Sequence, residues 1–357
     1  MPQMPKKILI AYRRQPPIIE YLERAFAKLG VEVIPLYMDE NTWFDKWVIH
    51  TVNKQLHNLR ILPKSKSLFE NHPLAHRNFL NNKLYSLYQA HQPDIVLLIR
   101  DSVFGHEALK KITCAKFGWW IESETRVGEI VDEMPLFDAY FCMNERSVQS
   151  LRASGAQHVS YLQHAVDTST FYAVPGIQKR HDLCFVGTYS DQRLAMIEAA
   201  LEVTKNIVIV GPGWQDRCRF NAPVKLLIQG ESIRGEALNQ LYNESRVVLN
   251  VTGWNAGAGV KNSGMNMRLM EVPATGTCLL TDEILELDQY FEVGKDLLVY
   301  KDVEDFKRQL HRCLESPAWC EQIGQHGQAT VTRKYTYDQT AETLIHKFQQ
   351  IKGQASE

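Results

Sequence analysis

The sequence predicts an α/β protein made of two Rossmann-like domains, each with a parallel sheet and the two facing across a cleft. Short apolar runs rich in β-branched residues alternate with longer stretches of helical period, as in parallel sheets covered on both faces. The alternation occurs in two separate series. In addition, 357 residues exceed the size at which one hydrophobic core usually stops growing.

Each series contains six predicted strands. They are 7–12, 31–38, 94–100, 117–123, 139–144 and 159–165 in the first half, and 182–188, 206–212, 224–230, 246–252, 277–282 and 297–302 in the second.

The boundary between the domains should lie between Ala165 and Asp182, in a turn-rich stretch that contains Pro-Gly. We therefore expect domains at 1–170 and 171–335. A C-terminal helix and tail at 336–357 should follow and pack back on the first domain.

The bulk composition excludes several classes of protein. A net charge of −1 disfavours a dedicated nucleic-acid binder, whose surface is strongly basic. No apolar run approaches the roughly 18 residues of a membrane-spanning helix, and no signal peptide is recognisable, so we expect a cytoplasmic protein. The seven cysteines are scattered without a C-x-x-C pair, which favours small buried side chains over zinc or disulfide frameworks.

Segment 46–87 stands out because it contains seven Lys and Arg residues and only one acid, Glu70. Aromatic residues and histidines are interleaved with them. A solvated helical insertion is one interpretation. The other is a contact surface for an anionic acceptor, a partner or a membrane face.

The sequence CFVGTYSDQR runs from a predicted strand through a glycine loop into a helix. Gly187 permits close backbone approach, and the start of the helix offers N–H groups to an anion. Arg193 lies in the first helical turn, where a cation is disfavoured unless an anion lies beside it. A bound phosphate would supply that anion. An arginine that points into solvent is the alternative.

The sequence GMNMRLMEVPATGT places Arg268 and Glu271 three residues apart in an apolar run. A helix should begin between Ser263 and Met267 and should kink or end near Pro273. Glu271 would lie about 7.5 Å along the axis from the helix start, within reach of a ribose whose diphosphate occupies that start. An ion pair between Arg268 and Glu271 is the alternative, which spacing alone does not exclude.

Several motifs are missing from the sequence. There is no D-x-D triplet, which usually holds a metal-bound nucleotide sugar, and no P-loop motif. No G-x-G-x-x-G follows the first strand, so a dinucleotide dehydrogenase is poorly supported. G-x-S-x-G is absent as well.

Segments of the second half follow one another in a characteristic order: FVGTYSDQR, NIVIVGPGW, IQGESIRGEALNQLYNESRVVLNVT, NMRLMEVPATGTCLLTD and YFEVGKDLLVYKDVEDFKRQL. This order, over residues 182–345, resembles the C-terminal domain of group-1 glycosyltransferases with the GT-B fold, most closely the spore-maturation CgeB-like branch. The resemblance implies a metal-independent, retaining transferase. It would move a sugar from a nucleotide diphosphate sugar, with UDP-sugars favoured, to a glycan, protein or small-molecule acceptor.

The resemblance also implies roles for residues of the second domain. Glu271 matches the glutamate that holds the donor ribose, and the positions before it face the diphosphate. The implied donor-binding residues are Gly187, Thr188, Arg193, Gly211, Gly230, Asn266, Met267, Arg268 and Glu271. The candidates for stabilising the departing diphosphate are Arg193, Lys261 and Arg268.

The first domain gives weaker signals. Three residues near the ends of predicted strands are candidates for acid/base catalysis, with a hydrogen-bonded structural role as the alternative for each: Glu122, Asp101 and His164. Arg13 and Arg14 stand on the acceptor side, where the family carries a Gly-Gly loop.

Ser263 stands eight residues before Glu271, where many group-1 enzymes carry a second glutamate. This departure leaves two further possibilities open. One is a sugar-nucleotide epimerase or hydrolase of the same fold, and the other is a catalytically inactive scaffold that binds sugar nucleotides.

Overall fold

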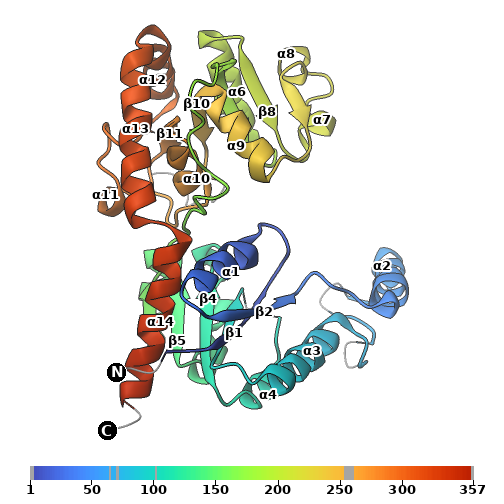
Figure 1. The fold of residues 1–357 in the computed structure, drawn as a ribbon. Helices are drawn as coiled ribbons and strands as arrows, with labels where there is room; N and C mark the ends of the chain where they lie inside the picture. Colours follow the sequence, from blue (N-terminus) through green and yellow to red (C-terminus); the bar gives the residue numbers. More distant parts are fainter. Residues whose placement is uncertain (1–3, 64–65, 70–71, 101–102, 253–260, 355–357) are drawn as a thin grey trace. The chain divides into compact units, whose positions relative to one another are not determined.

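The computed structural model divides the chain into two compact units (Figure 1). The first combines Met1–Leu162 with Thr340–Glu357, and the second is Gln163–Gln339. The structure describes residues 4–63, 66–69, 72–100, 103–252 and 261–354. Among the helices in these ranges, none combines the length and the apolar character that a membrane span requires.

The first unit is built on a sheet of six parallel strands in the order β2-β1-β3-β4-β5-β6. The strands are β1 (Lys7–Tyr12), β2 (Glu32–Tyr37), β3 (Ile95–Ile99), β4 (Ala115–Trp120), β5 (Ala139–Cys142) and β6 (Val159–Tyr161). Every residue of β3 and β5 is buried, because helices cover both faces of the sheet.

The helices of the first unit connect these strands. They are α1 (Ile18–Lys28), the π-helix η1 (Asp45–Ile49), α2 (His50–Asn58), α3 (His76–His91), α4 (His106–Lys110), the 3₁₀ helices η2 (Glu124–Glu129) and η3 (Val131–Leu136), and α5 (Glu145–Ala153). The long helix α14 (Tyr337–Gln354) starts in the second unit and packs with the first from Thr340 onward.

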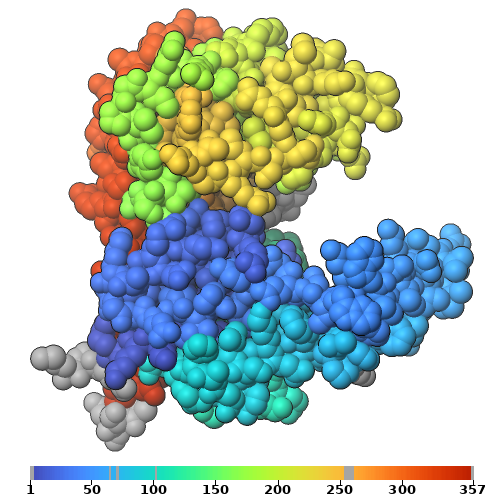
Figure 2. All heavy atoms as spheres, turned by 45° about the vertical axis from the view of Figure 1, so that its right-hand side comes forward, coloured from blue at the N-terminus to red at the C-terminus, as the bar shows by residue number. Residues whose placement is uncertain are grey.

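The basic segment 46–87 lies on η1, α2 and α3, and in Figure 2 the region around α2 projects from the rest of the first unit. Two of its cations make contacts inside the protein. Lys83 pairs with Glu40, and Arg77 donates a hydrogen bond to the carbonyl of Phe104 at 3.3 Å.

The second unit has its own six-stranded parallel sheet, in the order β12-β11-β10-β7-β8-β9. The strands are β7 (His181–Val186), β8 (Ile207–Val210), β9 (Ile228–Gly230), β10 (Ser245–Asn250), β11 (Cys278–Asp282) and β12 (Leu298–Tyr300). Its helices are α6 (Asp191–Val203), α7 (Trp214–Arg217), α8 (Ala222–Lys225), α9 (Gly235–Asn243), α10 (Arg268–Ala274), α11 (Leu287–Tyr290), α12 (Val303–Glu315) and α13 (Pro317–Lys334).

The predicted fold class is confirmed, since each of the twelve predicted runs overlaps a strand and all strands pair in parallel. The prediction of a strand over 224–230 was wrong for the first half of that run, because Val224 lies on α8. The side chain of Asn221 accepts a hydrogen bond from the backbone N–H of Val224, and Pro223 occupies the first turn. This cap starts a helix inside an otherwise strand-like apolar run, so that β9 begins only at Ile228.

The close packing of α13 on the second sheet depends on Gly324. A Cβ atom at this position would lie 2.1 Å from the carbonyl oxygen of Gly276, which is backbone and cannot rotate away. We expect Gly324→Ala to lower the free energy of unfolding by about 1–3 kcal/mol through overpacking. Urea denaturation would measure this loss. Gly353→Ala is the control, because a Cβ there meets nothing within 4 Å. Equal midpoints for the two variants would contradict the packing argument.

Candidate functional site

The strand order of the second sheet reverses between β7 and β10, which are neighbours in the sheet. The chain passes from β7 to β8 and β9 on one side and then returns to place β10 on the other side of β7. In open parallel sheets, ligands bind in the crevice that such a switch creates outside the carboxyl ends of the strands. Val186 ends β7 and Asn250 ends β10, so the residues that follow them form the candidate site.

Arg268 spans this switch point. It is the first residue of α10, and its guanidinium donates to the Oδ1 of Asn250 through Nη1 and to the carbonyl of Val186 through Nη2. The two acceptors belong to the ends of β10 and β7. Its Nε is buried and has no hydrogen-bond partner among the described residues.

Arg193 makes a second bridge at the same place. Its Nη1 donates to the carbonyl of Thr188 at 2.7 Å and its Nη2 to the carbonyl of Val251 at 3.1 Å. Its Nε is also buried without a partner in the described part of the chain. Arg193 therefore does not simply point into solvent, which was one of the two expectations for it.

The two guanidinium groups lie against the same aromatic ring. The Cζ atoms of Arg193 and Arg268 are 5.6 and 5.7 Å from the ring centroid of Phe185. Burial and then the positive charge of Arg268 lower the pKa of Arg193 to about 10, so the Arg193 guanidinium remains charged at neutral pH. Neither forms an ion pair with a carboxylate in the described ranges. The site thus holds two neighbouring positive charges that a bound anion would stabilise.

Glu271 lies in the first turn of α10 and is 8% exposed. Burial raises the pKa of its carboxyl group to about 7, although the positive charge of Arg268 acts in the opposite direction. Arg268 directs its guanidinium to the strands, and it forms no ion pair with Glu271. Within the described residues the Glu271 carboxylate accepts no hydrogen bond.

The start of α10 differs from the expectation. Met267 is the N-cap residue, and no side chain caps the helix. The backbone N–H of Leu269 donates to the carbonyl of Asn266, and those of Met270 and Glu271 donate to the carbonyl of Met267. These N–H groups are therefore occupied, so the positive charge at the site comes from the arginines. The helix ends at Ala274, one residue after Pro273, as the proline predicted.

Asn266 and Asn250 are held together at the centre of the site. Asn266 donates to the Oδ1 of Asn250 at 3.0 Å, and Asn250 donates to the hydroxyl of Thr281 at 2.9 Å. The Oδ1 of Asn266 is buried and has no partner within the described ranges. Asn250 was not predicted as a site residue, because its only signal in the sequence is a polar residue at the end of the apolar strand SRVVLN.

The loops after β7 and β8 touch closely. A Cβ atom on Gly211 would lie 2.0 Å from the carbonyl oxygen of Gly187, so no larger residue fits there. The backbone N–H of Gly211 donates to the carbonyl of Gly230 at 2.9 Å. The structure therefore brings these three predicted glycines together. Lys261 forms an ion pair with Glu283, with 3.5 Å between its Nζ and the Oε1 of the acid.

Ser263 hydrogen-bonds to the carboxylate of Glu286, which was not predicted as a site residue. Its hydroxyl donates to Oε1 of Glu286 at 2.5 Å, and the N–H of Gly264 donates to Oε2 at 3.0 Å. Glu286 is fully buried. A carboxylate thus contacts position 263, where the resemblance led us to expect an acid, but it comes from the segment before α11.

Three predicted residues of the first unit, Arg13, Arg14 and Glu122, follow the carboxyl ends of strands β1 and β4. Glu122 pairs with Nε of Arg100 at 2.8 Å and with Nη1 of Arg126 at 3.2 Å. Arg14 pairs with Glu40 at 3.1 Å and stacks on Tyr37, with its Cζ 4.1 Å from the ring centroid.

Arg13 follows β1 directly and is exposed. Burial and then the charge of Glu122 raise the pKa of Tyr12 to about 12, while Arg13 acts against them. Asp101 lies outside the described residues.

His164 belongs to the second unit and is 5% exposed. Burial lowers the pKa of its imidazole to about 4. The ring is therefore neutral at physiological pH and is a weak base.

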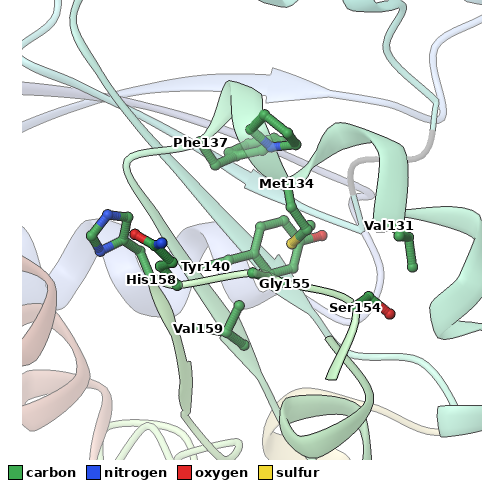
Figure 3. A pocket seen from close by; sticks show the side chains of 11 residues that line it. Val131, Met134, Phe137, Tyr140, Ser154, Gly155, His158 and Val159 are labelled. Carbon is green, nitrogen blue, oxygen red and sulfur yellow. The ribbon is translucent and has the colours of Figure 1, made fainter. Parts of the chain in front are cut away.

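A cavity of about 300 Å³ lies at the end of the first sheet where strands β5 and β6 begin (Figure 3). Phe137 and Tyr140 border it from the start of β5, His158 and Val159 from the start of β6, and Met134 from η3. These are the amino ends of the strands. Because ligands of such sheets bind at the carboxyl ends, we do not assign this cavity to the candidate site.

Comparison with known families identifies a domain in the second half of the chain. Residues 192–346 match the family described as glycosyl transferase-like. The match includes α6 with Arg193 and α10 with Glu271. No curated protein matches the chain in sequence.

Solved structures resemble the chain over almost its whole length. Sucrose-phosphate synthase from Thermosynechococcus elongatus has a TM-score of 0.69 at 14% identity and covers 98% of this chain and 99% of its own. HepE from Anabaena, solved with UDP-glucose, has a TM-score of 0.67 at 12% identity, covering 99% and 100%. TarM has a TM-score of 0.66 at 10% identity, covering 96% and 98%. The chain therefore has the same two-domain GT-B fold as these structures.

The raised pKa of Glu271 predicts how the stability of the protein changes with pH. Below pH 4.5 the carboxyl is protonated in both the folded and unfolded states and costs nothing. As the pH rises to about 7, only the unfolded state ionises freely, and the folded protein loses up to about 3 kcal/mol. We expect Glu271→Gln to be more stable than the wild type at pH 8 and nearly equal at pH 4.5.

Urea unfolding at both pH values would measure this difference. Glu342→Gln, which changes an exposed glutamate on α14, is the control and should leave the pH dependence unchanged. A constant difference between Glu271→Gln and the wild type from pH 4.5 to 8 would contradict the burial argument.

Proposed function

We propose that this protein is a glycosyltransferase that takes a sugar from a nucleotide diphosphate sugar. The observation that carries the proposal is the pair of guanidinium groups of Arg193 and Arg268 at the switch point of the second sheet. They share the ring of Phe185, and each keeps a buried Nε without a partner in the described part of the chain. A diphosphate fits this charge and these donors.

In this proposal the second unit binds the donor. Arg193 and Arg268 contact the diphosphate, next to the loops of Gly187 and Gly211. The Glu271 carboxylate accepts hydrogen bonds from the two ribose hydroxyls, which would compensate its burial. We propose UDP as the nucleotide, because HepE was solved with UDP-glucose.

Departure of the diphosphate concentrates negative charge on its oxygens, so preorganised cations lower the barrier most at that point. Two fixed guanidiniums can supply this charge, which supports our proposal of transfer without a metal ion. We further propose that the anomeric configuration is retained. The configuration of the product in NMR and the activity in EDTA test these two statements separately.

The acceptor would bind the first unit, near Arg13 and Arg14. Neither His164 nor Glu122 is well suited to accept a proton from the attacking hydroxyl. Burial lowers the pKa of the His164 imidazole to about 4, which makes it a weak base, and two arginines already hold the Glu122 carboxylate. Lys261 is bound to Glu283, so we propose an indirect role for it in donor binding.

The projecting part of the first unit suits contact with an anionic surface. Four large apolar side chains are each 68% exposed there: Trp43, Trp47, Leu59 and Ile61. Lys46 and Lys54 lie among them, and Lys46 is 5.6 Å from the ring of Trp47. Exposed tryptophan beside lysine is typical of surfaces that enter the headgroup layer of anionic membranes. We propose that the acceptor is presented on such a surface.

Donor binding tests the assignment of Glu271. We expect UDP-glucose to raise the melting temperature of the wild type, because a ligand that binds only the folded state stabilises it. Glu271→Ala should lose about 1–3 kcal/mol of binding, which is roughly 5- to 150-fold in the dissociation constant. Arg268→Ala should lose at least as much, since it removes a charged partner of the diphosphate.

Isothermal titration with folded variants would give these constants. Arg308→Ala removes an exposed arginine of α12 and should bind like the wild type. The ribose assignment is wrong if Glu271→Ala binds UDP-glucose with unchanged affinity. The diphosphate assignment fails if Arg268→Ala does so.

Sedimentation with vesicles tests the surface proposal. The wild type should bind vesicles that contain phosphatidylserine and should bind neutral vesicles weakly. The double variant Trp43→Ala/Trp47→Ala should lose at least tenfold in binding, because it removes two interfacial anchors. Phe220→Ala removes an 87% exposed aromatic ring from the second unit and should change nothing. Equal binding of the double variant and the wild type would refute the proposal.

A further inference from the structure

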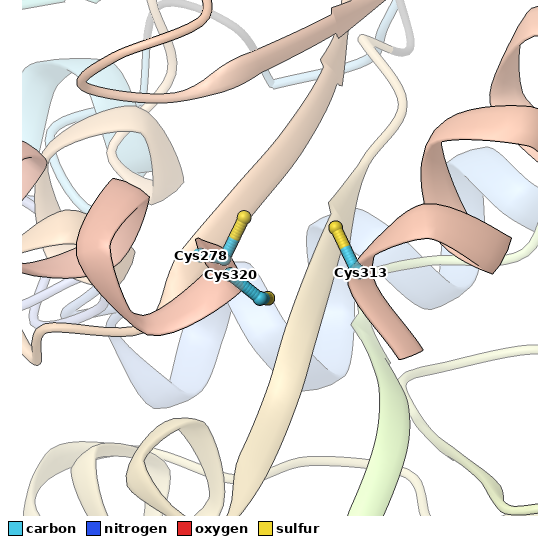
Figure 4. A group of neighbouring side chains, drawn as sticks. All are labelled: Cys278, Cys313 and Cys320. Atoms are coloured by element: carbon cyan, nitrogen blue, oxygen red, sulfur yellow. The ribbon is translucent and has the colours of Figure 1, made fainter. Parts of the chain in front are cut away.

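We propose that Cys278, Cys313 and Cys320 form a binding site for one soft, thiophilic metal ion, Cu(I). The three Sγ atoms lie within 4.8 Å of one another, and all three residues are buried. Figure 4 shows the side chains and the elements that carry them. This inference does not depend on the proposed function of the donor site.

The three cysteines come from three different elements. Cys278 begins β11, Cys313 lies near the end of α12, and Cys320 lies in the first turns of α13. A metal at the centre of three sulfurs, with bonds of about 2.3 Å, requires sulfur–sulfur distances of about 4 Å. The observed spacing reaches this value with shifts of less than about 1 Å. The folded chain therefore already holds the three ligands in place.

Charged side chains lie next to the cluster. Lys179 and Arg246, together with the acid Glu321, line a small cavity against the cysteines. Each thiol would release its proton to solvent when its bond to the metal forms. The resulting complex would carry a charge of about −2, which the two cations partly balance.

The number of ligands selects the metal. The cluster offers three sulfur atoms, and no histidine or carboxylate of the described residues completes it as a fourth ligand. Structural zinc sites are almost always tetrahedral with four ligands, whereas thiolates select Cu(I) by softness. The adjacent cavity of about 10 Å³ is no larger than about one water molecule, so the site is shielded from solvent.

The cluster is separate from the donor site. Cys278 stands at the amino end of β11, while the switch point lies at the carboxyl ends of the strands. Scattered spacing in the sequence favoured small buried side chains for the seven cysteines, and six of them are buried. The fold also gathers three of these six, because β11, α12 and α13 pack together.

The experiment uses reduced full-length protein under anaerobic conditions. It is titrated against the complex of Cu(I) with the chelator bicinchoninate. We expect the protein to remove one equivalent of Cu(I) and to show sulfur-to-copper charge-transfer absorption. X-ray absorption should show a shell of three sulfur atoms. Cys313→Ser and Cys320→Ser should each lower the affinity for Cu(I) at least tenfold. If one of the two variants does not fold, the other still tests the proposal.

The control is Cys114→Ser, which removes a half-buried thiol in the first unit and should bind like the wild type. Circular dichroism would confirm that each variant is folded. The proposal is overturned if the wild type removes no Cu(I), if both cluster variants bind as the wild type does, or if Cys114→Ser abolishes binding. Tighter binding of Zn(II) in a parallel competition would overturn the choice of metal.

Discussion

The interaction on which the candidate site depends is the bridge that Arg268 makes between β7 and β10. Its guanidinium joins the end of one strand to a side chain at the end of the other. Asn250, which accepts this bond, is itself tied to Thr281 on β11. A buried cation is expensive unless it is hydrogen-bonded, and here neutral acceptors satisfy its N–H groups without cancelling its charge. The crevice therefore keeps a positive potential in the absence of a ligand.

The same bridge explains the state of Glu271. An arginine and a glutamate three residues apart on a helix usually pair with each other. Here the strand ends hold Arg268, so the carboxylate remains buried without an ionic partner and the pKa of its carboxyl rises to about 7. The folded protein bears this cost within a seven-residue helix. Strain of this kind, where sequence-level rules fail, is typical of functional sites.

The sequence predicted the features that depend on local pattern. All twelve strands could be located, because strands buried on both faces are continuously apolar. The Arg268–Glu271 spacing identified the site but left its geometry open, since the direction of the guanidinium depends on β7, far away in the chain. Asn250, Glu286 and the cysteine cluster were missed for the same reason. Each of them contributes to a site only through contacts with residues that lie far away in the sequence.

The contact between Ser263 and Glu286 bears on whether the missing acid at position 263 argues against catalytic activity. The absence of an acid at position 263 left an inactive scaffold open as an alternative, because the resemblance places a carboxylate there. Yet chemical groups act through their position in space, whatever segment supplies them. A carboxylate does reach Ser263, from the opposite side of β11 in sequence, and it also fixes the backbone of Gly264 just before α10. Its buried hydrogen bonds make it a support for the loop that carries Asn266 and Arg268. The serine is thus part of the framework that orients the two donor-site residues, and its presence is no argument against activity.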